Sequence, residues 1–121
     1  MIAILCHFRY HVKISERMMM MSTVYPIHEI RSRLKPIFDA APVYRAVLFG
    51  SYAKGKATES SDIDIVIDSR GELLNIDFYG VLEDITETLG KKVDLIEITE
   101  IKQNSPIYSK IQSEGVLLYD R

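Results

Sequence analysis

Two aspartates, Asp62 and Asp64, stand in a stretch of chain where acidic and aliphatic residues alternate. A period of two is typical of a β-strand, so residues 62–68 are predicted to form a strand with both carboxylates on one face, roughly 6–7 Å apart. Carboxylates this close repel each other unless a cation lies between them. Hard oxygen ligands favour Mg²⁺ or Mn²⁺, and the sequence has no clustered Cys or His that would indicate zinc.

Gly50 and Ser51 are separated from Asp62 by ten residues and follow a short apolar run, residues 43–49. The β-branched and aromatic residues of this run predict a buried strand. Gly50 permits a tight turn after it, and residues 51–54 are predicted to form a short helix that stops at Gly55. Backbone N–H groups at the helix start, with the Ser51 hydroxyl, would suit a terminal phosphate. The sequence therefore predicts an anion site close to the two acids.

A third acid, Asp94, alternates with aliphatic residues in a second predicted strand, residues 91–97. If the two acidic strands are neighbours, the Asp94 side chain reaches the same site as Asp62 and Asp64. Three carboxylates can hold two ions about 3.5–4 Å apart, the arrangement used for in-line phosphoryl and nucleotidyl displacement. These three acids are the candidate catalytic and metal-binding residues.

Simpler interpretations stay open for each candidate. Asp62 and Asp64 would also fit the solvent face of an edge strand, although acids are depleted in strands. Ser51 would fit an ordinary helix cap, which uses the same geometry as phosphate binding. Asp94 would fit a surface acid, and Lys54, a candidate phosphate ligand beside Gly50 and Ser51, would fit a solvated lysine.

The rest of the sequence predicts helices that alternate with the strands. Apolar residues at helical spacing, with Pro and Gly near the ends, predict helices over residues 23–40, 75–89 and 105–115, and residues 116–119 are predicted to form a closing strand. Ile107 and Ile111 are predicted to face inward from the last helix. The alternation predicts an α/β or α+β fold, a small mixed sheet with helices packed on it.

Composition limits the classes of protein that the chain can belong to. A length of 121 residues with 47% hydrophobic content predicts one compact domain. The formal net charge is −2 and no basic stripe is present, which argues against long nucleic acid as a partner. The single Cys excludes an internal disulfide framework and suits the cytoplasm. No apolar stretch approaches the roughly 20 residues that span a bilayer, so no membrane association is expected.

Residues 1–21 differ in composition from the rest of the chain. They contain all five Met, the only Cys and two of the three His. We expect this segment to be a non-native or disordered extension, with the native start within Met18–Met21. Residues 22–121 are then the single domain.

The pattern of Gly50-Ser51, ten residues, Asp62-Ile63-Asp64 and a later strand aspartate resembles the polymerase-β-like nucleotidyltransferases. Residues 49–55 look like the smallest branch of that superfamily, the minimal nucleotidyltransferases (MNT), and the resemblance covers about residues 23–119. It implies the nucleotidyltransferase fold, with Gly50 and Ser51 gripping the nucleoside-triphosphate tail. Asp62 and Asp64 would bind the metals, and the third acid would help deprotonate an acceptor hydroxyl. The branch often has Arg where this chain has Lys54, which keeps the charge but loses the bidentate fork.

The resemblance also implies a reaction and a partner. Two Mg²⁺ ions, or Mn²⁺, would support transfer of AMP from ATP to a hydroxyl. MNT proteins of this kind typically pair with a helical HEPN-domain toxin, whose Tyr hydroxyl would be the acceptor; the chain would then be the antitoxin of a type VII-like toxin–antitoxin pair. A non-catalytic antitoxin that occludes its toxin and a small-molecule nucleotidyltransferase that modifies an antibiotic stay open as alternatives. The sequence leaves the choice between homo- and hetero-oligomer open.

Overall fold

Helices and strands alternate along the chain in the computed structural model, which describes residues 24–121. The predictions made for residues 1–21 lie outside this range. The elements are α2 (Ile27–Ala40), β1 (Arg45–Phe49), α3 (Gly50–Ala53), β2 (Ile63–Asp68), α4 (Ile76–Leu89), β3 (Val93–Glu97), the 3₁₀ turn η1 (Ile98–Glu100), α5 (Pro106–Glu114) and β4 (Val116–Asp120). The predicted mixed α/β architecture is confirmed.

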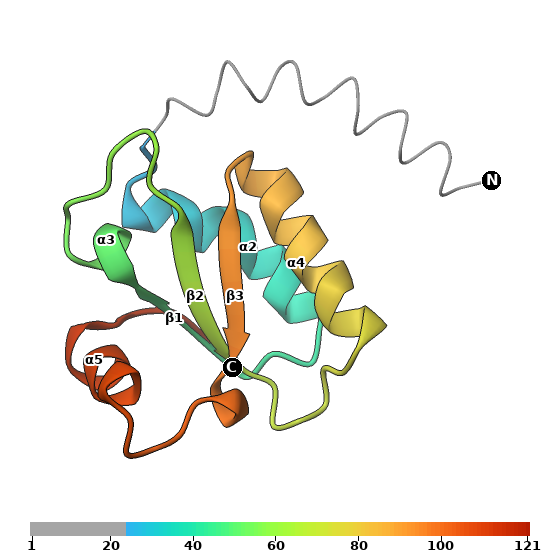
Figure 1. Cartoon of the computed structure of the whole chain (residues 1–121). Coiled ribbons are helices and arrows are strands. Elements are labelled where there is room, and N and C mark those ends of the chain that lie inside the picture. Colours follow the sequence, from blue (N-terminus) through green and yellow to red (C-terminus); the bar gives the residue numbers. More distant parts are fainter. Residues whose placement is uncertain (1–23) are drawn as a thin grey trace.

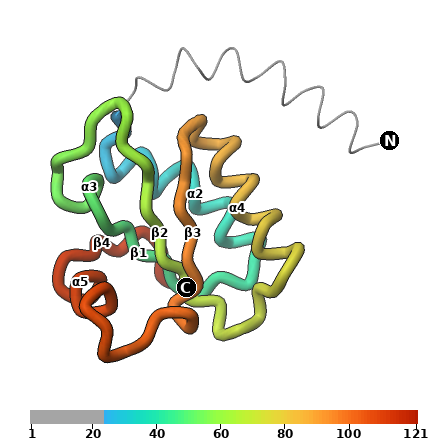
Figure 2. Tube along the Cα trace, viewed as in Figure 1, coloured from blue at the N-terminus to red at the C-terminus, as the bar shows by residue number. Residues whose placement is uncertain are grey.

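The four strands form one mixed sheet in the order β3-β2-β1-β4. β2 runs parallel to β3 and antiparallel to β1, which in turn is antiparallel to β4. Figure 1 shows α2 and α4 lying together behind β2 and β3, with α5 apart from them; the trace in Figure 2 places β4 near β1 and α5. Because β2 has a neighbour on each side, the edge-strand interpretation is wrong for Asp64. β2 begins at Ile63, so the prediction that Asp62 belongs to the strand is wrong by one residue.

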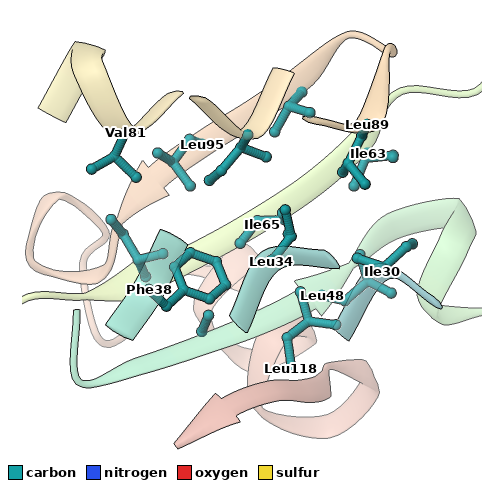
Figure 3. Packing of buried hydrophobic residues seen from close by; sticks show 14 of the residues in the cluster. Ile30, Leu34, Phe38, Leu48, Ile63, Ile65, Val81, Leu89, Leu95 and Leu118 are labelled. Carbon is teal, nitrogen blue, oxygen red and sulfur yellow. The ribbon is translucent and has the colours of Figure 1, made fainter. Parts of the chain in front are cut away.

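The core lies between the sheet and the layer formed by α2 and α4. Ile63 and Ile65 of β2 are fully buried and belong to one core cluster with Leu34 and Phe38 of α2. Figure 3 shows Ile65 beside Leu34 and Ile63 beside Leu89 of α4. Val66 is also buried, at 3% exposure, but it does not belong to this core cluster. The alternation of β2 thus places its isoleucines on the core face and Asp64, Val66 and Asp68 on the opposite face.

Two helix boundaries show how local chemistry sets the ends. α2 begins at Ile27 rather than at residue 23, because Pro26 is extended (φ −66°, ψ 153°) and its carbonyl accepts the first helical hydrogen bond, from Ile30 N at 3.2 Å. The helix continues through Pro36 and ends at Ala40, the predicted last residue. α4 ends at Leu89, the predicted last residue, and Gly90 caps it with a left-handed backbone (φ 65°).

The last helix, α5, differs from the prediction in one respect. Its N-cap is Ser105, whose hydroxyl accepts a hydrogen bond from Tyr108 N at 3.3 Å, and its second turn buries Ile111. Ile107 is 42% exposed, so the prediction that it faces inward is wrong. The helix is only nine residues long and packs on β1 over a small area, which leaves the first turn partly in solvent.

Candidate active site

The turn between β1 and α3 brings the backbone of Gly50 against an acidic side chain of β2. Gly50 has a φ of 73°, a left-handed conformation that residues with a Cβ rarely adopt. A Cβ at this position would overlap the Asp64 carboxylate and lie 3.3 Å from its Cγ. The absent side chain is therefore what allows Asp64 and the start of α3 to lie so close together.

Ser51 is the second residue of α3, and its side chain is half-buried. The residue at the N-cap position is Phe49, so the interpretation of Ser51 as a helix cap is wrong. Gly50 and Ser51 lie in the turn that packs against β2.

Asp64 and Asp94 lie side by side on neighbouring strands. They are register partners in the parallel pairing of β2 with β3, which fulfils the condition that the sequence left open. Burial raises the pKa of the Asp64 carboxyl to about 6, and hydrogen bonding to Asp94 and the negative charges of Asp94 and Asp62 act in the same direction. The Lys92 ammonium opposes them. Two carboxyls that share a site in this way favour a bound cation.

Asp62 stands one residue before β2, and its Oδ2 is 3.7 Å from the ammonium of Lys92. Both side chains are substantially exposed, so this ion pair is weak. Within residues 24–121 no three acidic, His or Cys side chains gather tightly enough to form a ready metal site. The donor set nevertheless fits a divalent cation, because the carboxyls of Asp64 and Asp94 are hard ligands on adjacent strands. Burial, and after it the hydrogen bond and the charge of Asp94, raise the pKa of Asp64, and a bound cation would offset these costs.

Lys54 forms an ion pair with an acid outside the candidate site. Its ammonium is 3.3 Å from Oε1 of Glu114, so it links the end of α3 to the end of α5. Both side chains are partly exposed, and the ion pair is of the surface kind. The structure therefore brings Gly50, Asp64 and Asp94 together and directs Lys54 toward α5.

Residues 27–118 match the protein family described as "Nucleotidyltransferase domain". The chain belongs to this family. A protein of Methanocaldococcus jannaschii named "Putative protein adenylyltransferase MJ1379" is 38% identical over 102 residues, 82% of this chain and 99% of that protein. A Thermococcus cleftensis protein named "Protein adenylyltransferase MntA" is 36% identical over 55 residues, 46% of this chain and 56% of that protein. The predicted resemblance to the nucleotidyltransferases is thus confirmed.

Solved structures share the nucleotidyltransferase fold with this chain. A chain in a crystal structure of a toxin–antitoxin with AMP-PNP aligns with a TM-score of 0.65 at 22% identity, covering 75% of this chain and 73% of that one. A chain in a structure of the tri-AMPylated Shewanella oneidensis HEPN toxin in complex with MNT antitoxin aligns with a TM-score of 0.60 at 18% identity, covering 78% and 73%. At these identities the likeness shows the shared fold.

Within residues 24–121 of this nucleotidyltransferase, no helix has both the length and the apolar character needed to cross a membrane.

Lys91 is a residue beside the nucleotidyltransferase site that the sequence did not reveal. Its side chain is buried, with 3% exposure, and its ammonium donates to the Glu59 carbonyl at 2.8 Å. Burial lowers its pKa, while the charges of Glu59 and Asp62 raise it. The hydrogen bond ties the loop that precedes Asp62 to the start of β3, where Ile63 N also donates to the Lys92 carbonyl at 3.0 Å. A pair of lysines before a strand gives no signal that one of them is buried.

Replacing Lys91 with methionine is expected to loosen this loop, because the Glu59 carbonyl loses its donor while the apolar stem keeps its volume. A lost hydrogen bond of about 1 kcal/mol corresponds to roughly fivefold faster amide exchange in residues 58–61, with α4 unaffected. Hydrogen exchange resolved by residue would measure the change, and Lys92→Met is the matched control, since Lys92 is 73% exposed. Unchanged exchange in the loop would contradict this role of Lys91.

Proposed function

We propose that this nucleotidyltransferase transfers AMP from ATP to a tyrosine hydroxyl of a HEPN-domain toxin, with Mg²⁺ as cofactor, and thereby acts as the antitoxin of the pair. Two kinds of similarity support this proposal. Relatives at 36–38% identity carry the name protein adenylyltransferase, and structures with the same fold include an MNT antitoxin with an AMPylated HEPN toxin.

The observation that carries the proposal is the pairing of Asp64 with Asp94 beside the Gly50 turn. Asp62, Asp64 and Asp94 would hold the divalent ions, with two Mg²⁺ or Mn²⁺ ions as the expected number. When bound, such ions offset the charge of the triphosphate and of the leaving pyrophosphate. Gly50 and Ser51 would bind the triphosphate tail at the start of α3.

Asp94 is suited to receive a proton from the acceptor. It is exposed, so a hydroxyl of another molecule has access to it, and it adjoins Asp64. The acceptor oxygen bonds to the α-phosphorus, the bond from that phosphorus to the pyrophosphate oxygen breaks, and the hydroxyl proton passes to the Asp94 carboxylate. General-base assistance of this kind typically contributes about 10²–10⁴-fold to a rate.

The test uses ATP labelled at the α-phosphate, Mg²⁺ and a cognate HEPN toxin. We expect label on the toxin with the parent chain and none with Asp64→Asn, and mass spectrometry should locate one or more AMP groups on tyrosine. Asp84→Asn makes the same chemical change at an exposed position of α4 and should label like the parent. A stable complex without transfer of any nucleotide would instead support occlusion, and labelling of an aminoglycoside would support the small-molecule enzyme.

A further inference from the structure

A cleft lies on the face of the sheet that carries Asp64, opposite the main core. Its volume is about 240 Å³, and most of its lining comes from β1, β2 and α5, with Ile98 of η1 and Leu117 of β4 completing it. Val47 and Val66 form its floor, Tyr108 and Gln112 of α5 form one wall, and Arg45 and Asp68 lie at the end farthest from Asp64. We call this feature the β1–β2–α5 cleft.

The cleft is at the right distance from the acids to receive part of a nucleotide. A strand rises about 3.3 Å per residue, so Val66 lies about 7 Å and Asp68 about 13 Å along β2 from Asp64. The ribose and base of a nucleotide whose α-phosphate lies at the paired acids extend over this range. Asp64 and the cleft residue Val66 lie on the same face of β2. The acids and the cleft therefore form a continuous surface.

The side chains of the cleft match the chemistry of a purine nucleoside. Tyr108 offers an aromatic ring for stacking, and the two valines offer an apolar surface for the other face of the base. The Gln112 amide carries both donors and acceptors, the combination that reads the edge of adenine. Within residues 24–121 neither the Gln112 amide nor the Tyr108 hydroxyl makes a hydrogen bond to another group. The polar groups of this wall therefore remain available to a ligand.

The position of the cleft favours the nucleotide over the acceptor as its occupant. β1 and β2 supply its floor, and these are the strands that lead to the Gly50 turn and carry Asp64. Among the described residues that line it, none comes from β3, the strand of Asp94. A hydroxyl that gives its proton to Asp94 approaches from the β3 side, away from the cleft.

We propose that the β1–β2–α5 cleft binds the base and ribose of the nucleotide substrate and selects a purine. This inference rests on the proposed function, because the triphosphate must first bind at the Gly50 turn and the acids. Tyr108 stacks on the base, Gln112 reads its edge, and α5 is thereby a specificity element of the enzyme.

The test measures binding of three probes to the full chain in the presence of Mg²⁺: α,β-methylene-ATP, the corresponding CTP analogue and inorganic tripolyphosphate. The parent chain is expected to bind the ATP analogue more tightly than the other two. Tyr108→Ala is expected to weaken binding of the ATP analogue by about 5- to 100-fold, the usual effect of losing a stacked base, and to leave tripolyphosphate binding unchanged. Gln112→Ala, an exposed position that does not threaten folding, should reduce the preference for ATP over CTP.

Tyr79→Ala is the matched control, because this tyrosine is 67% exposed on α4 and lies outside the cleft. Equal affinity of the parent for the ATP analogue and tripolyphosphate would overturn the role of the cleft and leave the proposed function standing. Unchanged affinity of both cleft variants for the ATP analogue would do the same. A parent chain that binds neither ATP analogue nor tripolyphosphate would overturn the proposed function itself.

Discussion

Replacing Gly50 with alanine is expected to lower nucleotidyl transfer at least about 100-fold. The new methyl group would overlap the Asp64 carboxylate. Either Asp64 or the turn must then move, which disturbs the position of Asp64 beside Asp94. A displacement of about 1 Å in a catalytic group can cost about 10²-fold in rate. The left-handed backbone of Gly50 adds a conformational cost of about 1–2 kcal/mol to the variant.

Gly55→Ala separates the overlap with Asp64 from the cost of the left-handed backbone. Gly55 has nearly the same backbone conformation (φ 71°), but nothing lies within 4 Å of the position that its Cβ would take. Its alanine variant should lose a similar amount of stability from the backbone and keep transfer within a few-fold of the parent. Thermal unfolding and single-turnover labelling of the toxin would measure both quantities. Equal loss of transfer in the two variants would show that the contact with Asp64 is unimportant.

The alternation of acidic and aliphatic residues was sufficient to predict the face on which the β2 acids lie. The alternation of Asp64 with Ile63 and Ile65 predicts a strand whose isoleucines face the core, and the same holds for Asp94 between Val93 and Leu95. It did not reveal that Val66, on the face of Asp64, is buried as well. The sequence did not specify that these strands are adjacent and parallel with Asp64 opposite Asp94. That register depends on how α4 crosses from one strand to the next, which is a tertiary property.

Other features of the site depend on contacts that no local pattern records. Gly50 was predicted as a turn residue, but its approach to Asp64 requires two segments fourteen positions apart to meet. The burial of Lys91 depends on the path of the loop that carries Glu59. The β1–β2–α5 cleft depends on how α5 packs over the sheet. The sequence of this nine-residue helix predicted an apolar side but no cleft beside it.

Replacing Asp64 with asparagine is expected to stabilise the metal-free protein while it abolishes transfer. The pKa of Asp64 is about 6 in the folded protein, above its ordinary value of 3.8, chiefly because of burial. A shift of this size corresponds to roughly 3 kcal/mol, which solvent screening of a half-buried group reduces to about 1 kcal/mol. Asparagine has nearly the same shape and can donate a hydrogen bond to Asp94, but it carries no charge. We therefore expect a rise in Tm of about 4–8 °C at pH 8.

The pH dependence of the rise in Tm shows whether Asp64→Asn stabilises the protein by removing a charge or by changing the packing. Between the unfolded and folded pKa values of Asp64, the folded protein binds more protons than the unfolded chain, so the stability of the parent falls as pH rises through this window. Below about pH 3, well under the ordinary pKa of 3.8, the carboxyl is protonated in both states, and the parent and Asp64→Asn should unfold at the same temperature. The difference between their Tm values should grow as pH approaches 6 and stay constant above pH 7. The difference in Tm between the parent and Asp84→Asn should not change over this pH range.

Metal binding should make the parent more stable than Asp64→Asn, the reverse of their order without metal. In the proposed function Mg²⁺ or Mn²⁺ would bind the folded parent between carboxylates, and at 100 times its dissociation constant it would add about 2.7 kcal/mol to the free energy of unfolding. Asp64→Asn lacks one of these ligands and should show little or no metal-dependent rise in Tm. Equal stabilisation of both proteins by metal would place the ion elsewhere. A difference in stability that persisted at pH 3 would mean that shape, and not the cost of burying the Asp64 charge beside Asp94, limits the stability of this site.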